Sequence, residues 1–371
     1  MASLKLALFC MTGFLVLVFI GTLDQVNLGI FYAQKKYFQS FFLYWNPMAG
    51  VKIPIFPGGF LLGNLLIINL LSVIFVRRLF RREKWGLLVI HVGLVVLLLG
   101  GGLTSYLGVE SQAQIEEGQK VFYSENTRSV ELAIIRQLNS DDDKVVAIPE
   151  SVLKEEGVVE VPELPFSVHV HKFLPNAVLS RGEQESERFP EVTEGIGVRL
   201  QVAPKPVFVQ DNLINVSTVF VELYLEKRSL GMWLFSRGLD ATQTVTVHGV
   251  DYVMQIRPER YYVPYSLTLK DFSHDRYVGT DIPKNFSSLV QLEDAERKES
   301  REILIYMNHP LRYRGKTYYQ ASFGKNDTLS VLQVVENPSW LLPYISCTLI
   351  SVGLSIQFLT SFIRFSRKKR K

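Results

Sequence analysis

Apolar and polar positions divide this chain into four long apolar stretches and one long polar stretch. A helix needs about 20 apolar residues to cross the hydrocarbon layer of a membrane, and each apolar stretch has roughly that length. We therefore predict a membrane protein with four transmembrane α-helices, at Leu4–Leu23, Gly58–Val76, Trp85–Tyr106 and Trp340–Phe362. The polar stretch before the last helix, about 230 residues long, is large enough for a folded domain of its own.

Within that polar stretch, β-branched and aromatic residues alternate with polar ones, a pattern typical of half-buried strands. The segments that carry it are Val130–Ile135, Phe166–Phe173, Ile196–Val202, Val216–Glu226, Thr244–Val247, Tyr252–Arg257, Tyr265–Phe272, Ile303–Met307, Lys316–Phe323 and Leu329–Val335. Turn signals at His248–Asp251 and Arg314–Lys316 predict hairpins. We predict a large extracytoplasmic, mainly-β domain, built as a sandwich or an open barrel.

The predicted organisation has three segments. Residues 1–106 form a three-helix membrane segment with an aromatic outer loop at 24–57, residues 107–339 form the β-rich domain, and residues 340–371 form the fourth helix and a basic tail. We interpret the first helix as a retained anchor. A cleaved signal peptide is the alternative, but no typical cleavage motif follows the apolar run.

Lysine and arginine set the predicted orientation, because connections rich in these residues stay in the cytoplasm. Basic residues crowd the connection 77–84 and the tail after Phe362. Both termini are therefore predicted to be cytoplasmic, in a multi-pass protein of the inner (cytoplasmic) membrane whose large domain is periplasmic or extracytoplasmic. The net charge of +4 comes mostly from these clusters, which we interpret as topology signals and contacts with the lipid bilayer, with no nucleic acid involved.

Composition excludes several kinds of chemistry. The two cysteines, Cys10 and Cys347, both lie in predicted helices, so the β-rich domain has no disulfide, thiol-exchange motif or cysteine-bound metal. The sequence has no G-x-S-x-G, P-loop or H-E-x-x-H motif. Hydrolase or ATPase activity therefore has no support, and no catalytic residue is predicted.

His91 is the residue that points most directly to chemistry. It is the one ionisable side chain in the apolar run between Trp85 and Tyr106. Hydrocarbon offers imidazole no water, so a histidine there faces a protein partner, a cavity or a bound group. Neutral imidazole is a common ligand of haem iron, which makes His91 a candidate haem axial ligand. The alternative is a histidine that hydrogen-bonds a neighbouring helix and does no chemistry.

Glycines on the same helix add to this hypothesis. Residues three or four apart share a helix face, and such steps lead from His91 to Leu94, Val95, Leu98 and Gly102. Gly102 ends a glycine triplet that begins at Gly100, and glycine lets another helix or a flat macrocycle approach the backbone closely. The combination predicts a lined groove, with simple helix packing as the alternative. His91 lies roughly 9 Å past the basic connection, at 1.5 Å per residue, hence nearer the cytoplasmic side.

The other histidines lie in the predicted β domain. His169 and His171 alternate along one strand, so both imidazoles point to one face. They could bind a metal if a third ligand arrived, but no acidic partner is evident nearby, and a solvated strand face is the alternative. His248 and His274 are interpreted as turn residues, and His309 belongs to a separate pattern.

That pattern spans residues 306–323, with the sequence YMNHPLRYRGKTYYQASF. It resembles the NxPLxYxGxxxYQxSF pattern of the ResB-like family, also called CcsB, and it predicts a β-hairpin that turns at Arg314-Gly315. Further similarities to this family are the Ser3-Leu4-Lys5 start, Gly21-Thr22 after the first apolar run, the IHVGL sequence of the third helix and the large domain inserted before the last helix. The resemblance extends over essentially the whole chain.

This resemblance implies a function. ResB-like proteins are partners of CcsA (ResC) proteins in system II cytochrome c maturation, which moves haem outward and attaches it to the two CxxCH thiols of apocytochrome c. The chain would then be a non-catalytic or half-site subunit of a cytochrome c haem lyase (synthase) complex. By position, His91 resembles one axial ligand of a b-type haem that is held transiently and shared with the CcsA/ResC-type partner. The tryptophan-rich haem motif belongs to that partner, and the four tryptophans here are scattered.

Two other functions remain open at this stage. A membrane-anchored scaffold or peptide-binding β domain would need no cofactor, and His91 would then be a packing residue. A transmembrane electron carrier is less well supported, because such helices generally supply several histidines and the predicted helices contain one.

Overall fold

The computed structural model describes residues 2–48, 50–139, 142–182, 189–210, 213–277, 279, 283–324 and 328–369. The chain forms two compact units. The first, which we call the membrane unit, comprises Met1–Val109, Val209–Asn212 and Glu336–Lys371, and the second, the β unit, comprises Glu110–Phe208 and Leu213–Val335.

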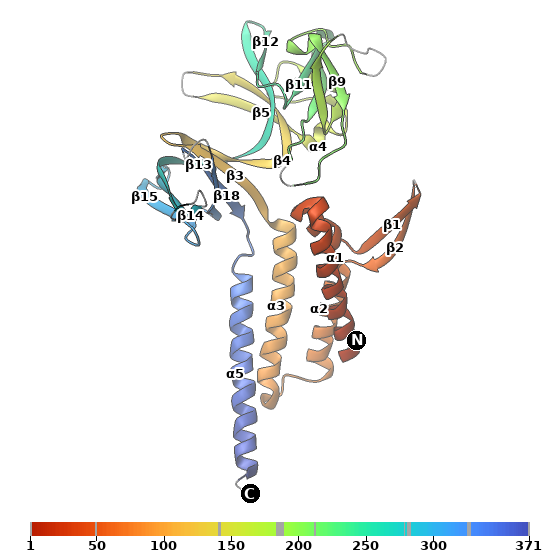
Figure 1. The fold of residues 1–371 in the computed structure, drawn as a ribbon, viewed down its shortest axis with the longest axis vertical. Helices are drawn as coiled ribbons and strands as arrows, with labels where there is room; N and C mark the ends of the chain where they lie inside the picture. The colour runs from red at the N-terminus through yellow and green to blue at the C-terminus, as the bar shows by residue number, and fades with distance from the viewer. Residues whose placement is uncertain are drawn as a thin grey trace. The chain divides into compact units, whose positions relative to one another are not determined.

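Within the described residues, the membrane unit contains four helices that are long and apolar enough to cross a membrane. They are α1 (Leu4–Tyr37), α2 (Gly59–Val76), α3 (Trp85–Leu107), which the short 3-10 helix η1 (Arg82–Lys84) precedes, and α5 (Leu342–Lys369). Figure 1 shows α3 between α5 and α2. The predicted fold class, four transmembrane helices joined to a large mainly-β domain, is confirmed.

α1 continues beyond Leu23, into the segment that was predicted to be a loop. Gly29 adopts φ 72° and ψ 164°, which glycine tolerates and a helix does not, so the chain changes direction there. Asp24 holds the segment after this kink, because its Oδ2 accepts hydrogen bonds from Lys36 Nζ at 2.7 Å and from the Tyr37 hydroxyl at 2.8 Å. The prediction missed this contact because its partners lie on either side of the kink.

The rest of the aromatic segment forms a hairpin of β1 (Phe42–Met48) and β2 (Val51–Pro57). Its base is fixed to the helix ends, since the Gly58 amide donates to the Phe41 carbonyl at 2.8 Å. Figure 1 shows the hairpin projecting from the ends of α1 and α2. Both strands expose large apolar side chains, which include Phe42, Tyr44, Trp45, Met48, Val51, Ile53 and Ile55.

The β unit is built from strands, with only short helices between them. The strands are β3 (Val109–Glu116), β4 (Lys120–Gln137), β5 (Asp143–Pro149), β6 (Gly157–Val159), β7 (Ser167–Leu174), β8 (Ala177–Arg181), β9 (Leu200–Pro204), β10 (Thr218–Leu225), β11 (Arg228–Ser236), β12 (Gln243–Val247), β13 (Val250–Arg276), β14 (Pro283–Asp294), β15 (Glu299–Tyr306), β16 (Leu311–Tyr313), β17 (Lys316–Gly324) and β18 (Leu329–Glu336). The helices are α4 (Glu150–Leu153) and η2 (Ile196–Arg199).

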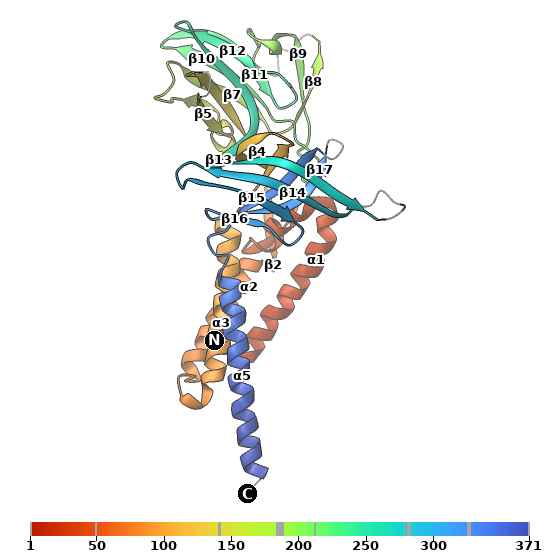
Figure 2. The same cartoon turned by 90° about the vertical axis from the view of Figure 1, so that its left-hand side faces the viewer.

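Two long strands, β4 and β13, contribute to both hydrophobic cores of the β unit. At one end they pair with β5 and β12, and this sheet packs on the four-stranded sheet β11-β10-β7-β6 to form a sandwich core. At the other end the strand order β15-β14-β13-β4-β3-β18-β17-β16 forms a nearly closed, barrel-like sheet around a second core. Figure 2 shows β4 and β13 between these two parts. The sandwich and barrel alternatives therefore occur together.

Three strand predictions were wrong in their boundaries. Tyr252–Arg257 and Tyr265–Phe272 belong to the single strand β13, whose pairing with β4 shifts register after Pro258 and again between Tyr262 and Leu267. Register shifts of this kind let a strand accommodate proline. Ile196–Val202 begins as the 3-10 helix η2, in which Gly197 packs so closely on Leu234 that an added Cβ would lie 2.5 Å from the Leu234 Cβ.

Candidate functional site

His91 lies on α3 and is half-buried. Its Nδ1 atom lies 2.7 Å from the backbone carbonyl oxygen of Leu87, one helical turn earlier. A carbonyl oxygen only accepts hydrogen bonds, so Nδ1 carries the proton and the lone pair of the neutral ring lies on Nε2. Among the described residues no hydrogen-bond partner is recorded for Nε2. The ring is therefore held in the tautomer that leaves Nε2 available to a metal.

The opposite face of α3 packs against α5 through glycines spaced seven residues apart. A Cβ added at Gly86 would lie 2.7 Å from the backbone nitrogen of Gln357, and one at Gly93 would lie 2.7 Å from Cγ1 of Ile350. The Ser346 hydroxyl donates to the Gly93 carbonyl at 2.8 Å. At about 100° per residue, His91 is about 160° around the helix from Gly93. The imidazole therefore does not take part in the α3–α5 contact.

The predicted glycine groove is divided between two faces of α3. Gly100 packs on α5, since an added Cβ would lie 2.9 Å from the Cβ of Leu342. Gly101 and Gly102 are exposed, and an added Cβ at either would meet nothing within 4 Å. Gly102 is eleven residues after His91, which places it within about 20° of the same helix face. The alternative of simple helix packing is thus correct for Gly100. At Gly102, on the helix face that carries His91, the backbone remains open.

These residues fit one axial position of a haem. The imidazole presents an unprotonated nitrogen on a face of α3 that α5 does not contact. A second histidine ligand is not available within the membrane unit, because the other five histidines of the chain, His169, His171, His248, His274 and His309, belong to the β unit. The described residues also contain no group of three His, Cys, Asp or Glu side chains that could hold a metal ion.

His169 and His171 lie on the same face of β7, as predicted. The His171 Nε2 lies 3.0 Å from Oε2 of Glu222 on β10, and the His169 ring packs on Tyr224 with 4.4 Å between ring centroids. The acidic partner was not evident from the sequence because it comes from a neighbouring strand. Burial opposes ionisation of Glu222, but hydrogen bonds from Ser229, Tyr224 and His171 outweigh it and lower the pKa of Glu222. This cluster is a hydrogen-bonded sheet face.

The predicted hairpin is present as β16 and β17, which pair Leu311 with Tyr318 and Tyr313 with Lys316. Arg314 (φ 45°) and Gly315 (φ 81°) form its turn. The Tyr318 hydroxyl lies 2.8 Å from the Tyr265 hydroxyl inside the barrel. The motif therefore contributes to the barrel core.

His309, at the start of the same motif, is exposed. Its ring stacks on Tyr306 with 4.1 Å between ring centroids, and its Nδ1 lies 3.4 Å from the Met307 carbonyl. It thus closes the turn between β15 and β16, where an isolated bridge joins Tyr306 to His309.

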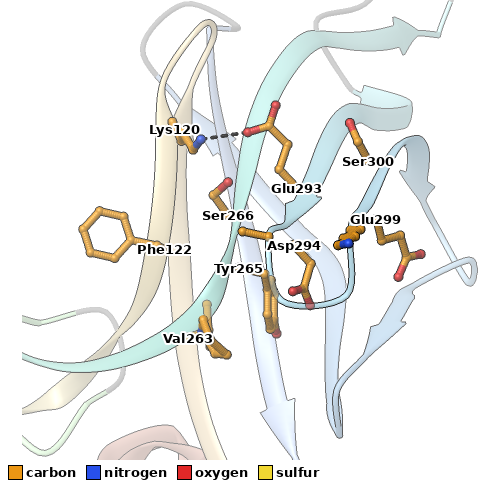
Figure 3. A pocket seen from close by; sticks show the side chains of 12 residues that line it. Lys120, Phe122, Val263, Tyr265, Ser266, Glu293, Asp294, Glu299 and Ser300 are labelled. Atoms are coloured by element: carbon orange, nitrogen blue, oxygen red, sulfur yellow. Dashed lines mark hydrogen bonds and ion pairs between the residues drawn. The ribbon is translucent and has the colours of Figure 1, made fainter.

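A pocket of about 530 Å³ lies on the barrel wall, where β13 and β4 separate between Tyr262 and Leu267. Figure 3 shows Lys120 and Glu293 side by side at this pocket, and their charged groups are 2.7 Å apart. Asp294 and Glu299 also line it, but their carboxylates accept hydrogen bonds from the Tyr313 hydroxyl in the barrel interior. The pocket therefore has no free acid–base pair aimed into it among the described residues.

The fold and the His91 site define a four-helix membrane protein that carries a sandwich-and-barrel β domain and one imidazole presented within a membrane helix. Residues 236–332 match the family model of the ResB-like family, which confirms the resemblance. Over 305 residues the chain is 26% identical to Protein NrfI of Wolinella succinogenes. That similarity covers 81% of this chain and 30% of NrfI, so the chain spans about a third of the length of this relative.

Proposed function

We propose that this chain is a subunit of a system II cytochrome c synthase complex. Together with a CcsA/ResC-type partner, it transports haem across the membrane and presents it for covalent attachment to the CxxCH thiols of apocytochrome c. The observation that carries the proposal is the 2.7 Å contact between His91 Nδ1 and the Leu87 carbonyl, which leaves Nε2 available as a ligand inside an apolar helix. The ResB-like match supports the same pathway.

His91 has the role of an axial ligand to the haem iron in this proposal. When bound, haem supplies the group that is joined to the cysteine thiols. The hydrogen bond from Nδ1 to Leu87 fixes the ring orientation, as outer-shell partners of metal-bound histidines generally do. His91 is a binding residue, so the chain acts as a non-catalytic or half-site subunit of the haem lyase.

The second axial ligand comes from the partner. The membrane unit contains a single histidine, so a b-type haem at His91 would be shared with the partner and held only transiently by this chain. The open backbone at Gly101 and Gly102 gives the partner or the macrocycle access to the face that carries His91.

The proposal also includes an orientation in the inner membrane. The basic connection 77–84 and the basic tail after Phe362 favour cytoplasmic termini, because such segments are retained on that side. The β unit then lies on the extracytoplasmic side, where it meets apocytochrome c.

The test is the variant His91→Ala, co-purified with the CcsA/ResC-type partner. The wild-type complex should show the absorption spectrum of a b-type haem. Haem affinity should fall at least about tenfold in the variant, since loss of an outer-shell partner alone costs that much at other metal sites. Added imidazole should restore part of the spectrum, because it can occupy the vacated ligand position.

His169→Ala is the matched control, because it removes an imidazole that packs on Tyr224 in the β unit. Haem content and cytochrome c yield should stay at wild-type levels in this control. A wild-type complex without haem, or a His91→Ala complex with unchanged haem and cytochrome c yield, would contradict the proposal. Either result would favour a membrane-anchored scaffold with no cofactor.

A further inference from the structure

The outer edge of β12 carries unpaired backbone groups. β12 pairs with β13 through a two-residue turn at His248 (φ 52°) and Gly249 (φ 74°), which makes Val247 and Val250 a hydrogen-bonded pair. Alternate residues then point their backbone groups the other way, so the N–H and C=O of Thr244 and Thr246 face outward. Among the described residues, no strand pairs with this side of β12.

Other edges of the sandwich are protected in ways that β12 is not. The edge strand β5 carries Lys144 and Pro149, and the edge strand β6 has only three residues. The edge of β11 is covered, because the amides of Thr193 and Glu194 donate to the Met232 carbonyl at 3.0 and 3.1 Å. β12 has five residues with no proline, no charge and no register shift. It is therefore an edge with the features of a template for a further strand.

Space for such a strand is present beside this edge. A pocket of about 550 Å³ lies against Thr244 and Thr246, and its other wall is formed by Leu230, Gly231 and Trp233 of β11. The Trp233 side chain is almost completely buried in the sandwich core beneath the pocket. The pocket lies between edge strands of the two sandwich sheets, β12 and β11.

The Gln243 side chain, at the start of β12, bridges β12 to its neighbours. Its Nε2 donates to the Leu234 carbonyl at 2.7 Å, and its Oε1 accepts from the Ile196 amide at 2.9 Å. These two hydrogen bonds tie β12 to β11 and to η2. Arg228 and Glu194, both exposed, also line the pocket and provide one charge of each sign.

We propose that the β12 edge binds an extended segment of a client polypeptide by adding it as a further strand. Alternating donors and acceptors at strand spacing are complementary to another extended backbone, and pockets beside the edge accept its side chains. The identity of the client rests on the proposed function, in which it is an unfolded apocytochrome c. An extended client also suits haem attachment, because both CxxCH thiols must be accessible.

The first test uses a fluorescently labelled synthetic peptide centred on a CxxCH sequence, kept reduced, and the full-length protein in detergent micelles. Fluorescence anisotropy should report binding. Two further peptides carry backbone N-methyl groups on either the odd or the even residues. In a strand only alternate amides face the neighbouring strand, so one methylated peptide should lose binding and the other should retain it. Equal loss or equal retention would overturn strand addition, as would no binding of the unmodified peptide.

The second test changes the protein. Thr246→Pro removes an outward N–H without removing a bond to β13, and its ring blocks the edge, so peptide affinity should fall about tenfold or more. Thr246→Val keeps the N–H and removes only the hydroxyl, which donates to Asp251 at 2.7 Å, so it should bind within about twofold of wild type. Equal affinity of the two variants, with unchanged thermal unfolding, would refute the assignment.

These results are separable from those of the haem proposal. His91→Ala lies in the membrane unit and should leave peptide binding unchanged. Thr246→Pro should leave the haem spectrum of the complex unchanged while lowering the yield of cytochrome c. A complex without haem that still binds the peptide would refute the proposed function, whereas the proposal that the β12 edge binds a further strand would stand.

Discussion

The hydroxyl of Tyr313 lies 2.7 Å from Oδ2 of Asp294, and both side chains are buried in the barrel. The same hydroxyl lies 2.9 Å from Oε2 of Glu299, and Arg314 pairs with Asp294 at 2.8 Å. The ResB-like hairpin thus joins β16 to the β14–β15 turn through charged hydrogen bonds. Such bonds are stronger than neutral ones, and leaving a buried partner unsatisfied is costly.

The pH dependence of the β unit should follow from this contact. Burial, together with hydrogen bonds to Asp294 and Glu299, raises the pKa of Tyr313 to about 12 from its ordinary value of 10.0. A group whose pKa is higher in the folded state stabilises the fold below its unfolded pKa and loses that contribution as pH rises. The thermal unfolding midpoint of the full chain should therefore decrease as the pH is raised from 10 to about 12.

Tyr313→Phe checks this assignment. The variant should unfold at a lower temperature at pH 7, and its midpoint should depend less on pH above 10 than that of the wild type. Tyr319→Phe is the matched control, because Tyr319 is an exposed tyrosine on the neighbouring strand β17. An alkaline transition that is identical in wild type and Tyr313→Phe would show that Tyr313 is not its source.

Because α3 packs closely on α5, alanine substitutions at two glycines of α3 should change the unfolding midpoint in opposite directions. A Cβ at Gly86 would lie 2.7 Å from the Gln357 nitrogen and 2.9 Å from its Cα, so α5 must move to admit Gly86→Ala. The unfolding midpoint of the detergent-solubilised chain should fall. The Cβ that Gly101→Ala adds has no neighbour within 4 Å, and alanine favours a helix more than glycine does. The unfolding midpoint of this variant should therefore equal or exceed that of the wild type. Equal effects at the two positions would contradict the helix contact.

The membrane helices were predictable from the sequence because a bilayer span requires a long apolar run, and the chain has four of them. The direction change in α1 was not, because it depends on Gly29 and on a contact across the kink between Asp24 and Tyr37. Strand β14 was also missed. Its alternation is broken by Ser288, a fully buried residue that hydrogen-bonds Ser330 on β18 at 2.7 Å.

The candidate site was likewise predictable from the sequence only in part. An ionisable residue within an apolar run singles out His91 from sequence alone. The bond to Leu87 follows from helix geometry once the ring faces that way, but the separation of Gly100 from Gly102 depends on where α5 packs. The β12 edge required the strand order of the whole β unit, which local sequence patterns do not contain.

The β1–β2 hairpin should lie in the lipid headgroup region. A two-stranded ribbon buries little surface by itself, and tryptophan and tyrosine favour the membrane–water interface. Trp45 is 58% exposed. In a vesicle-reconstituted variant that retains only this tryptophan, its fluorescence should be quenched by brominated lipids. A variant that retains only the buried Trp233 of the β unit is the control and should be unaffected. Quenching of Trp45 by aqueous iodide, and not by lipid, would place the hairpin in water.

The last prediction concerns the helix face that carries His91. A substitution on this open face should affect the assembled complex and not the chain alone. Gly102→Leu adds a branched side chain within about 20° of the helix face of His91 and about 16 Å further along the helix, where the described residues place nothing within 4 Å of an added Cβ. The unfolding midpoint of the chain alone should therefore be unchanged or higher, since leucine favours helix. The same side chain should obstruct the partner helix or the macrocycle, so the complex should lose haem, partner, or both. Gly101→Leu is the matched control, because it is equally exposed but about 80° around the helix from His91, and its effect should be smaller. If Gly102→Leu retains full haem and partner content, nothing approaches this face closely, and the second ligand must reach the iron from another direction.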